Sequence, residues 1–125
     1  MQARASGILL PVFSLPGPYG IGSLGKSARQ FINFLSDGKQ KFWQILPLVP
    51  PGGGDSPYMS PSSFAGNPLL LDLELLQEEG LLTQDELNSA RWNNPDRVDY
   101  AWLHQTRLPL LRKAWDRGRQ YTAPG

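Results

Sequence analysis

The chain has 125 residues, of which 40% are hydrophobic and 18% are charged, and its 12 basic and 11 acidic side chains leave a net charge of +1. This composition allows a packed core and argues against wholesale disorder, and without a basic stripe we expect no binding of nucleic acid. The absence of cysteine excludes a disulfide framework and a thiolate metal site.

The first apolar run of the chain, residues 8–10, stops at Pro11. It is far too short for the core of a signal peptide or for a membrane span. We therefore expect a cytoplasmic protein that does not contact a membrane.

The first half of the chain predicts a strand–helix–strand unit. Residues 7–13 form a continuous apolar run, which is typical of a strand buried on both faces of a parallel sheet. A helix over 27–37 follows, with Gly38 at the place of a left-handed C-cap glycine, and 42–46 predicts a second buried strand. We expect the two strands to be parallel neighbours that the helix connects. The apolar face of this helix consists of Ala28, Phe31, Ile32 and Leu35.

Both predicted strands lead into loops rich in glycine and proline, at 14–25 and 47–68. In α/β folds ligands bind at the carboxyl ends of the strands, so these loops should hold the functional residues. The second loop combines hydroxyl groups, the Asp55 carboxylate and the aromatic rings of Tyr58 and Phe64. This mixture suits a sugar, whose C–H face stacks on an aromatic ring while short polar groups bond its hydroxyls. It suits equally well a long loop in which Asp55 only bonds local backbone amides.

The glycines of the first loop, Gly20, Gly22 and Gly25, match the G-x-G-x-x-G pattern of a dinucleotide-binding turn between a strand and a helix. Two features argue against that function. A proline-containing segment, 16–18, lengthens the connection, and Asp55 comes too late in the chain to hold a ribose hydroxyl. A nucleotide-binding α/β domain is therefore the alternative hypothesis. We expect instead a glycine-rich loop that lets backbone segments pack closely.

The second half of the chain predicts helices. Asp72 can cap a short helix that Gly80 ends. Thr83 and Glu86 have the spacing of a capping box, which starts the next helix. An amphipathic segment over 99–117 predicts a further helix.

The residues of this half that could carry chemistry have structural explanations. His104 is the only histidine and lies in a predicted helix without neighbouring ligands, so we expect no metal site there. A glycosidase needs two carboxylates that face each other across a sugar, and Asp55 is the only acid in a loop of interest. We expect the tryptophans of this half to pack in the core: Trp92, Trp102 and Trp115.

The predicted sheet has only two strands, because no strand pattern follows 42–46. Parallel strands need neighbours and cover on both faces, so a two-stranded parallel sheet is not stable by itself. We therefore expect the chain to be part of a larger fold.

Five linked motifs carry a resemblance to a known family: SGILL (6–10), SLPGPYGIG (14–22), WQILPL (43–48), GDSPY (54–58) and FAGNP (64–68). In this order and spacing they resemble the N-terminal segment of the 4-alpha-glucanotransferases of the amylomaltase type, glycoside hydrolase family 77. The resemblance runs to the end of the chain, more weakly after Leu76, where the VDY of 98–100 is still similar.

The resemblance implies a (β/α)8 barrel with an insertion after the second strand, a fold that takes about 250 residues. Residues 1–125 would then be the N-terminal part of the barrel, its first two βα units, and about 72–125 would start a helical insertion. The implied reaction moves a segment of a 1,4-α-glucan or maltooligosaccharide to the 4-hydroxyl of an acceptor glucose, with retention through a covalent glycosyl-enzyme.

The resemblance also implies which groups carry that reaction. An aspartate nucleophile, a glutamate acid/base and a second, stabilising aspartate are expected from later strands, beyond Gly125. No metal and no organic cofactor is expected. The oligomeric state does not follow from the resemblance. We expect residues 1–125 alone to be inactive.

Three residues of this chain match substrate-binding positions of the family. Tyr58 matches the tyrosine that stacks on the glucose next to the scissile bond, and Ser56 matches a neighbouring serine that contacts substrate. Asp55 is expected to support the loop. Gly53 and Pro61 stand where aromatic residues are common, which puts an accessory glucan contact at Gly53 in question and should stiffen or shift the loop.

Two other classes of function stay open beside the transferase. One is the nucleotide-binding domain that uses Gly20 to Gly25. The other is a non-catalytic, glucan-binding remnant that keeps Tyr58. Disproportionation of maltotriose separates a transferase from such a remnant.

Overall fold

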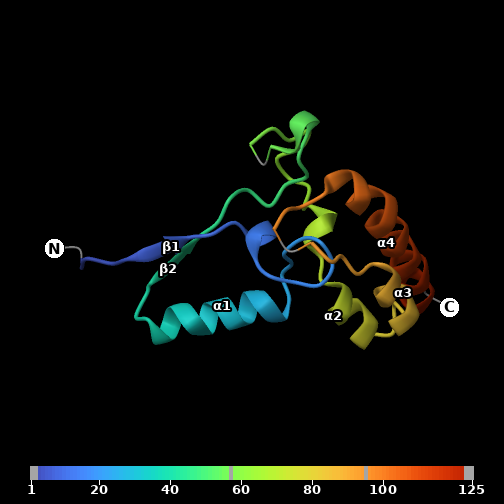
Figure 1. Cartoon of the computed structure of the whole chain (residues 1–125), viewed down its shortest axis with the longest axis horizontal. Coiled ribbons are helices and arrows are strands. Elements are labelled where there is room, and N and C mark those ends of the chain that lie inside the picture. Colours follow the sequence, from blue (N-terminus) through green and yellow to red (C-terminus); the bar gives the residue numbers. More distant parts are fainter. Residues whose placement is uncertain (1–2, 57, 95, 123–125) are drawn as a thin grey trace.

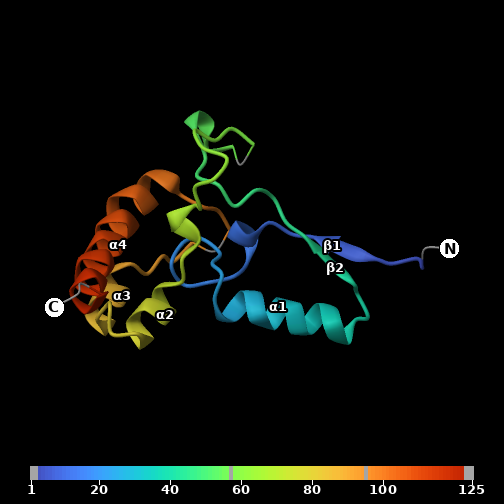
Figure 2. The same cartoon turned by 180° about the vertical axis from the view of Figure 1, so that it is seen from behind.

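A strand–helix–strand unit forms one end of the molecule, and helices form the other end (Figure 1). The view from behind shows the same arrangement (Figure 2). The computed structural model describes residues 3–56, 58–94 and 96–122. Its elements are β1 (Gly7–Leu9), η1 (Val12–Ser14), α1 (Lys26–Asp37), β2 (Phe42–Gln44), η2 (Gly53–Asp55), η3 (Pro68–Leu70), α2 (Leu73–Glu78), α3 (Gln84–Ser89) and α4 (Tyr100–Thr122), where η denotes a short 3-10 helix.

The strands β1 and β2 are parallel neighbours joined by α1, which confirms the predicted order and direction. Each strand has three residues, so the predicted strands 7–13 and 42–46 are too long. Pro11 has no N–H to offer to the ladder, and the chain turns into η1 directly after it. The pairs in register are Gly7 with Phe42, Ile8 with Trp43 and Leu9 with Gln44.

The helix α1 packs on the strand pair through an aromatic contact. The Phe31 ring lies edge-on to Trp43, with 5.0 Å between ring centroids, and the indole N–H of Trp43 donates to the Leu10 carbonyl at 2.8 Å. The predicted burial of both strand faces is wrong within the described chain, because Leu9 is 58% and Phe42 63% exposed. Nothing among the described residues covers these side chains.

The helix α1 occupies the predicted position, and it buries Leu35 but leaves Ile32 of the predicted apolar face 51% exposed. Its C-terminus differs from the prediction. Gly38 has a φ of −80°, and the left-handed position falls on Lys39, with a φ of 60°. The N–H of Gln40 then donates to the Leu35 carbonyl at 2.9 Å, which closes a Schellman-type cap one residue later than predicted.

Side-chain caps start the helices of the second half as the sequence predicts. The Asp72 carboxylate accepts the N–H of Leu75 at 2.9 Å and starts α2, which ends before the left-handed Gly80. Thr83 and Glu86 form the predicted capping box: the Thr83 hydroxyl accepts the N–H of Glu86, and the Glu86 carboxylate accepts the N–H of Thr83. These bonds fix where α2 and α3 begin.

The helix α4 begins where the Asp99 carboxylate accepts the N–H of Trp102 at 3.0 Å. The helix has 23 residues in total and continues through Pro109, so it ends later than the predicted 99–117. Arg117 donates to both carboxylate oxygens of Glu86, at 2.7 and 2.8 Å, and this pair holds α4 against α3. None of the helices in the described ranges has the apolar length needed to cross a membrane.

The core consists of two clusters of buried hydrophobic side chains, and α4 contributes to both, with Leu103 in one and Leu110 in the other. Trp92 and Trp102 are half-buried, with ring centroids 4.5 Å apart, in agreement with the prediction. The prediction is wrong for Trp115, which is 65% exposed because it lies on the face of α4 that turns away from both clusters.

Candidate functional site

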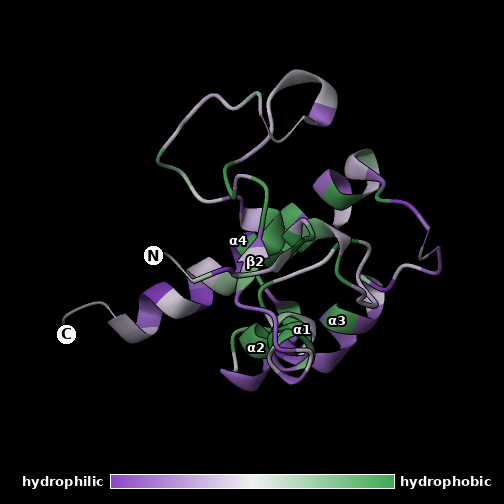
Figure 3. Cartoon of the chain, turned by 90° about the vertical axis from the view of Figure 1, so that its left-hand side faces the viewer, coloured by the Kyte–Doolittle hydropathy of each residue, from purple (hydrophilic) through white to green (hydrophobic). Residues whose placement is uncertain are grey.

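The loop that follows β2, residues 47–68, stands away from the rest of the chain (Figures 1 and 3). Its base is tied at both ends. The N–H of Asn67 donates to the Leu48 carbonyl at 2.7 Å, and the N–H of Gly52 bonds the Met59 carbonyl. The Asn67 side chain accepts a backbone N–H at 3.0 Å and caps η3, which is the local role that the sequence allows for it.

The tip of this loop presents Tyr58. The Ser56 hydroxyl oxygen accepts the N–H of Tyr58 at 3.3 Å, and the Ser56 carbonyl accepts the N–H of Met59 at 3.2 Å. The Tyr58 side chain is 73% exposed, so its ring is free to take a flat ligand. The backbone just before it reverses through two left-handed residues, Gly54 with a φ of 82° and Asp55 with a φ of 57°. The structure thus brings together Asp55, Ser56 and Tyr58 at one turn.

Asp55 faces Tyr100, at the start of α4, and both line a small pocket under the loop. Burial raises the pKa of the Tyr100 hydroxyl, and the negative charge of Asp55 raises it further. None of the hydrogen bonds found among the described residues uses the Asp55 carboxylate, so the expected support of the loop comes only from its backbone. Its N–H donates to the Gly52 carbonyl at 3.3 Å. Sequence reasoning missed Tyr100, because a contact between residues so far apart has no local signal.

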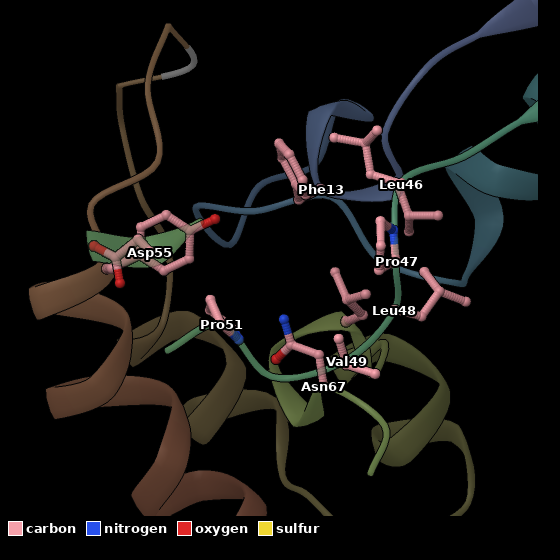
Figure 4. Close-up of a pocket in the computed structure, with 11 residues that line it drawn as sticks. Phe13, Leu46, Pro47, Leu48, Val49, Pro51, Asp55 and Asn67 are labelled. Carbon is pink, nitrogen blue, oxygen red and sulfur yellow. The ribbon is translucent and has the colours of Figure 1, made fainter. Parts of the chain in front are cut away.

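The pocket under the loop has an apolar wall and a polar edge. Figure 4 shows the Asp55 carboxylate on one side and the side chains of Leu46, Pro47 and Leu48 on the other. Phe13, from η1, closes the pocket between them. The pocket thus lies beyond the carboxyl ends of β1 and β2, between η1 and the loop 47–68.

The glycine motif of the first loop serves backbone packing. A Cβ on Gly22 would lie 2.1 Å from the Val12 carbonyl oxygen, and a Cβ on Gly25 would lie 2.1 Å from an oxygen of Asp72. Gly20 has a φ of 85°, which side chains rarely adopt. Gly22 and Gly25 thus allow the protein's own atoms to approach the backbone closely, which supports the packing interpretation over the nucleotide-binding one.

His104 is exposed on the surface of α4 and lines neither the pocket under the loop 47–68 nor the other described pockets. Within the ranges that the structure describes, no group of three or more histidine, aspartate or glutamate side chains could hold a metal ion. The acids near the loop 47–68 also do not form a pair, because among the described residues Asp55 is the only carboxylate that lines the pocket beneath this loop.

Comparisons with known proteins agree on one family. A family profile described as 4-alpha-glucanotransferase matches residues 10–124. The 4-alpha-glucanotransferase of Streptococcus pneumoniae is 50% identical over 115 residues, which are 91% of this chain and 23% of that protein. The 4-alpha-glucanotransferase of Thermus thermophilus is 45% identical over 121 residues, 97% of this chain and 23% of that protein.

A solved structure supports the same assignment at the level of the fold. The amylomaltase from Streptococcus agalactiae in complex with acarbose matches with a TM-score of 0.86 and 48% sequence identity. The match covers 91% of this chain and 23% of that one. The chain thus spans about a quarter of the length of the relatives and of the solved structure that it matches, 23% in each case.

Proposed function

This chain belongs to the 4-alpha-glucanotransferase family, glycoside hydrolase family 77, and we propose that it forms part of an enzyme that transfers segments of 1,4-α-glucan. In that reaction a donor maltooligosaccharide is cut, and its glycosyl part moves to the 4-hydroxyl of an acceptor glucose or glucan. Because the chain spans 23% of the length of its relatives, the activity is proposed for the protein of full length.

At the level of the fold, we propose that β1 and β2 are the first two strands of a (β/α)8 barrel. The parallel pairing of β1 and β2 across α1 supports this assignment. The exposed side chains of Leu9 and Phe42 would be covered by later parts of such a barrel. The helices from about 72–125 would start an insertion beside it.

The observation that carries the proposal is the exposed Tyr58 ring on a loop at the carboxyl end of β2. We propose that the ring stacks on the C–H face of the glucose at the cleavage point. The Ser56 hydroxyl accepts the backbone N–H of Tyr58 at 3.3 Å, which holds the turn in shape. We propose that this hydroxyl also contacts the sugar. The backbone N–H of Asp55, which donates to the Gly52 carbonyl, would support the turn that positions Tyr58.

Retaining glycosyl transfer needs a carboxylate nucleophile and a carboxylic acid that protonates the leaving oxygen, about 5–5.5 Å apart. The nucleophile forms a glycosyl ester as the donor's glucosidic bond breaks. The acceptor's 4-hydroxyl then attacks that ester and gives its proton back to the same acid/base group. Asp55 has no second carboxylate beside it in the pocket. We therefore assign no catalytic group to residues 1–125, and we propose that the reaction needs no metal or organic cofactor.

Incubation of a protein of the relatives' length, carrying this chain, with maltotriose tests the proposal. Transfer yields glucose and longer maltooligosaccharides while the total number of reducing ends stays constant. Growth in reducing ends would indicate hydrolysis and would contradict the assignment. Binding of maltotriose without any product would instead identify a glucan-binding protein that lacks catalysis.

A further inference from the structure

A second polar pocket, with a volume of about 240 Å³, lies between the first loop and the N-terminal ends of α1 and α2. In Figures 1, 2 and 3 these helices lie on the opposite side of the molecule from the loop 47–68. The pocket is therefore separate from the candidate site at Tyr58. Its volume is below the range of about 300–1,000 Å³ that is typical of drug-sized ligands, which limits it to a ligand of about one sugar unit.

The pocket contains a buried guanidinium group whose hydrogen bonds are incomplete. Arg107, on α4, is 2% exposed and lines the pocket. Its terminal nitrogens donate to the carbonyls of Tyr19, at 3.3 Å, and of Leu71. Its Nε has no hydrogen-bond partner among the described residues. A buried donor without a partner is unfavourable. Because Nε itself is inaccessible, a ligand would meet the guanidinium through the N–H groups of the terminal nitrogens that do not bond these two carbonyls.

The charges in the pocket balance, since Lys26 and Arg107 are positive and Asp72 and Glu74 are negative. Burial lowers the pKa of Arg107 to about 10, so it stays charged at neutral pH. An anion such as phosphate would meet two carboxylates as well as two cations. A neutral ligand with several hydroxyl groups fits better, because each hydroxyl both donates to a carboxylate and accepts from a cation.

Other side chains complete the set of donors and acceptors at the walls. The Asp72 carboxylate already accepts the Ser23 hydroxyl at 2.6 Å, and this bond fixes its position. Glu74 receives only a long bond from the Tyr19 hydroxyl, at 3.5 Å, and so keeps free acceptor capacity. The carboxamide of Gln30, on α1, adds both a donor and an acceptor.

We propose that this pocket binds one glucose unit of an α-glucan, with Arg107 as donor and Glu74 and Gln30 as partners of its hydroxyls. The choice of glucose among hexoses rests on the proposed function, whereas the fit of a neutral sugar rests on the pocket. A glucan chain held at this second site stays tethered to the protein that carries Tyr58, which raises its effective concentration at that residue.

The test measures glucose binding by calorimetry to a protein of the relatives' length, in a Tyr58→Ala background that removes the stacking ring of the other site. The pocket is altered by Glu74→Gln and by Gln30→Ala. The matched controls are Glu78→Gln and Arg29→Ala, which change exposed neighbours on the same helices that do not line the pocket.

We expect the Tyr58→Ala protein to bind glucose and each pocket substitution to weaken this binding about tenfold or more, with no change in the controls. Gln30 is exposed, so Gln30→Ala keeps the test valid if Glu74→Gln unfolds. Absence of glucose binding, or binding that neither pocket substitution weakens, overturns the proposal. Binding of inorganic phosphate that both substitutions alter would also overturn it, in favour of an anion site. Failure of the proposed function shows separately, as absence of maltotriose transfer by the unsubstituted enzyme.

Discussion

A Cβ on Gly25 would lie 2.1 Å from Oδ2 of Asp72, which places this carboxylate directly at the N-terminal end of α1. The Ser23 hydroxyl holds the same oxygen at 2.6 Å. The N-terminus of a helix attracts anions, and here the protein's own acid takes that position. A phosphate bound at this helix end would therefore meet a carboxylate.

The first prediction follows from this contact. Titration of the protein with NAD should give no saturable binding, because Asp72 repels the pyrophosphate and blocks its approach. Tryptophan fluorescence and calorimetry are suitable measurements. Saturable NAD binding that Asp72→Asn strengthens would show that the loop is a nucleotide site after all.

A second prediction concerns Gly22. A Cβ there would lie 2.1 Å from a backbone oxygen of Val12, so Gly22→Ala should destabilise the fold by about 1–3 kcal/mol through overpacking. Nothing lies within 4 Å of a Cβ on Gly53, and Gly53→Ala should stay within about 0.5 kcal/mol of the parent. Urea unfolding monitored by tryptophan fluorescence compares the two variants. Equal effects of both substitutions would contradict the packing explanation of the motif.

A third prediction concerns pH. The bonds from Arg117, together with the N–H of Thr83, lower the pKa of Glu86 from 4.5 to about 2. Because the folded carboxyl group has the lower pKa, its contribution is complete above about pH 4.5 and is lost as the pH falls toward about 2. Glu86→Gln keeps a capping oxygen but removes the charge, and should cost about 0.5–1 kcal/mol at neutral pH.

The measurement is the free energy of unfolding between pH 5 and pH 2. The decrease in the free energy of unfolding per pH unit over this range should be smaller in Glu86→Gln than in the parent. Glu78→Gln, at an exposed position on α2, serves as the control and should leave the slope unchanged. An identical slope in the parent and in Glu86→Gln would show that the pair with Arg117 does not act in the folded state.

A fourth prediction concerns residues 1–125 by themselves. The described residues place no second carboxylate beside Asp55 in its pocket, so incubation of this chain with maltotriose should yield neither glucose nor longer maltooligosaccharides. The exposed apolar side chains of β1 and β2 should also make it prone to self-association, which light scattering detects. Turnover that Asp55→Asn abolishes would place the catalytic machinery in this chain.

The sequence predicted features that depend on local chemistry. The caps at Asp72 and Thr83 and the position of α1 follow from neighbouring residues, and all of them are confirmed. The C-cap at Gly38 was wrong, because which residue becomes left-handed depends on how the helix end joins β2, and Lys39 takes that conformation.

Features that depend on contacts between distant segments were harder to predict. The apolar run at 7–13 indicates burial throughout, yet Ile8 and Leu9 in β1 are exposed and only Val12 is fully buried. The exposure of Trp115 has the same origin, because helical periodicity alone does not show which face meets a partner. Tyr100 and Arg107 each line a pocket because of how α4 packs against the first half of the chain. The spacing of residues in the sequence does not predict this packing.

The candidate site was predictable only in part. The loop chemistry and the family resemblance singled out Asp55, Ser56 and Tyr58, and the structure brings them together in one turn. Their contact with a sugar stays a prediction. It depends on Tyr58 presenting its ring to substrate in the protein of full length.

The kinetics of Tyr58→Ala in a protein of the relatives' length, with maltotriose as substrate and Tyr58→Phe as control, test this claim most directly. The stacked ring should stabilise the sugar more as it flattens toward an oxocarbenium ion, so Tyr58→Ala should lower kcat about tenfold or more and also raise KM. Tyr58→Phe keeps the ring and should retain most of the parent kcat. A Tyr58→Ala variant that keeps the parent kcat would contradict the account even if its KM rises, because the ring would then give at most uniform binding and no transition-state stabilisation.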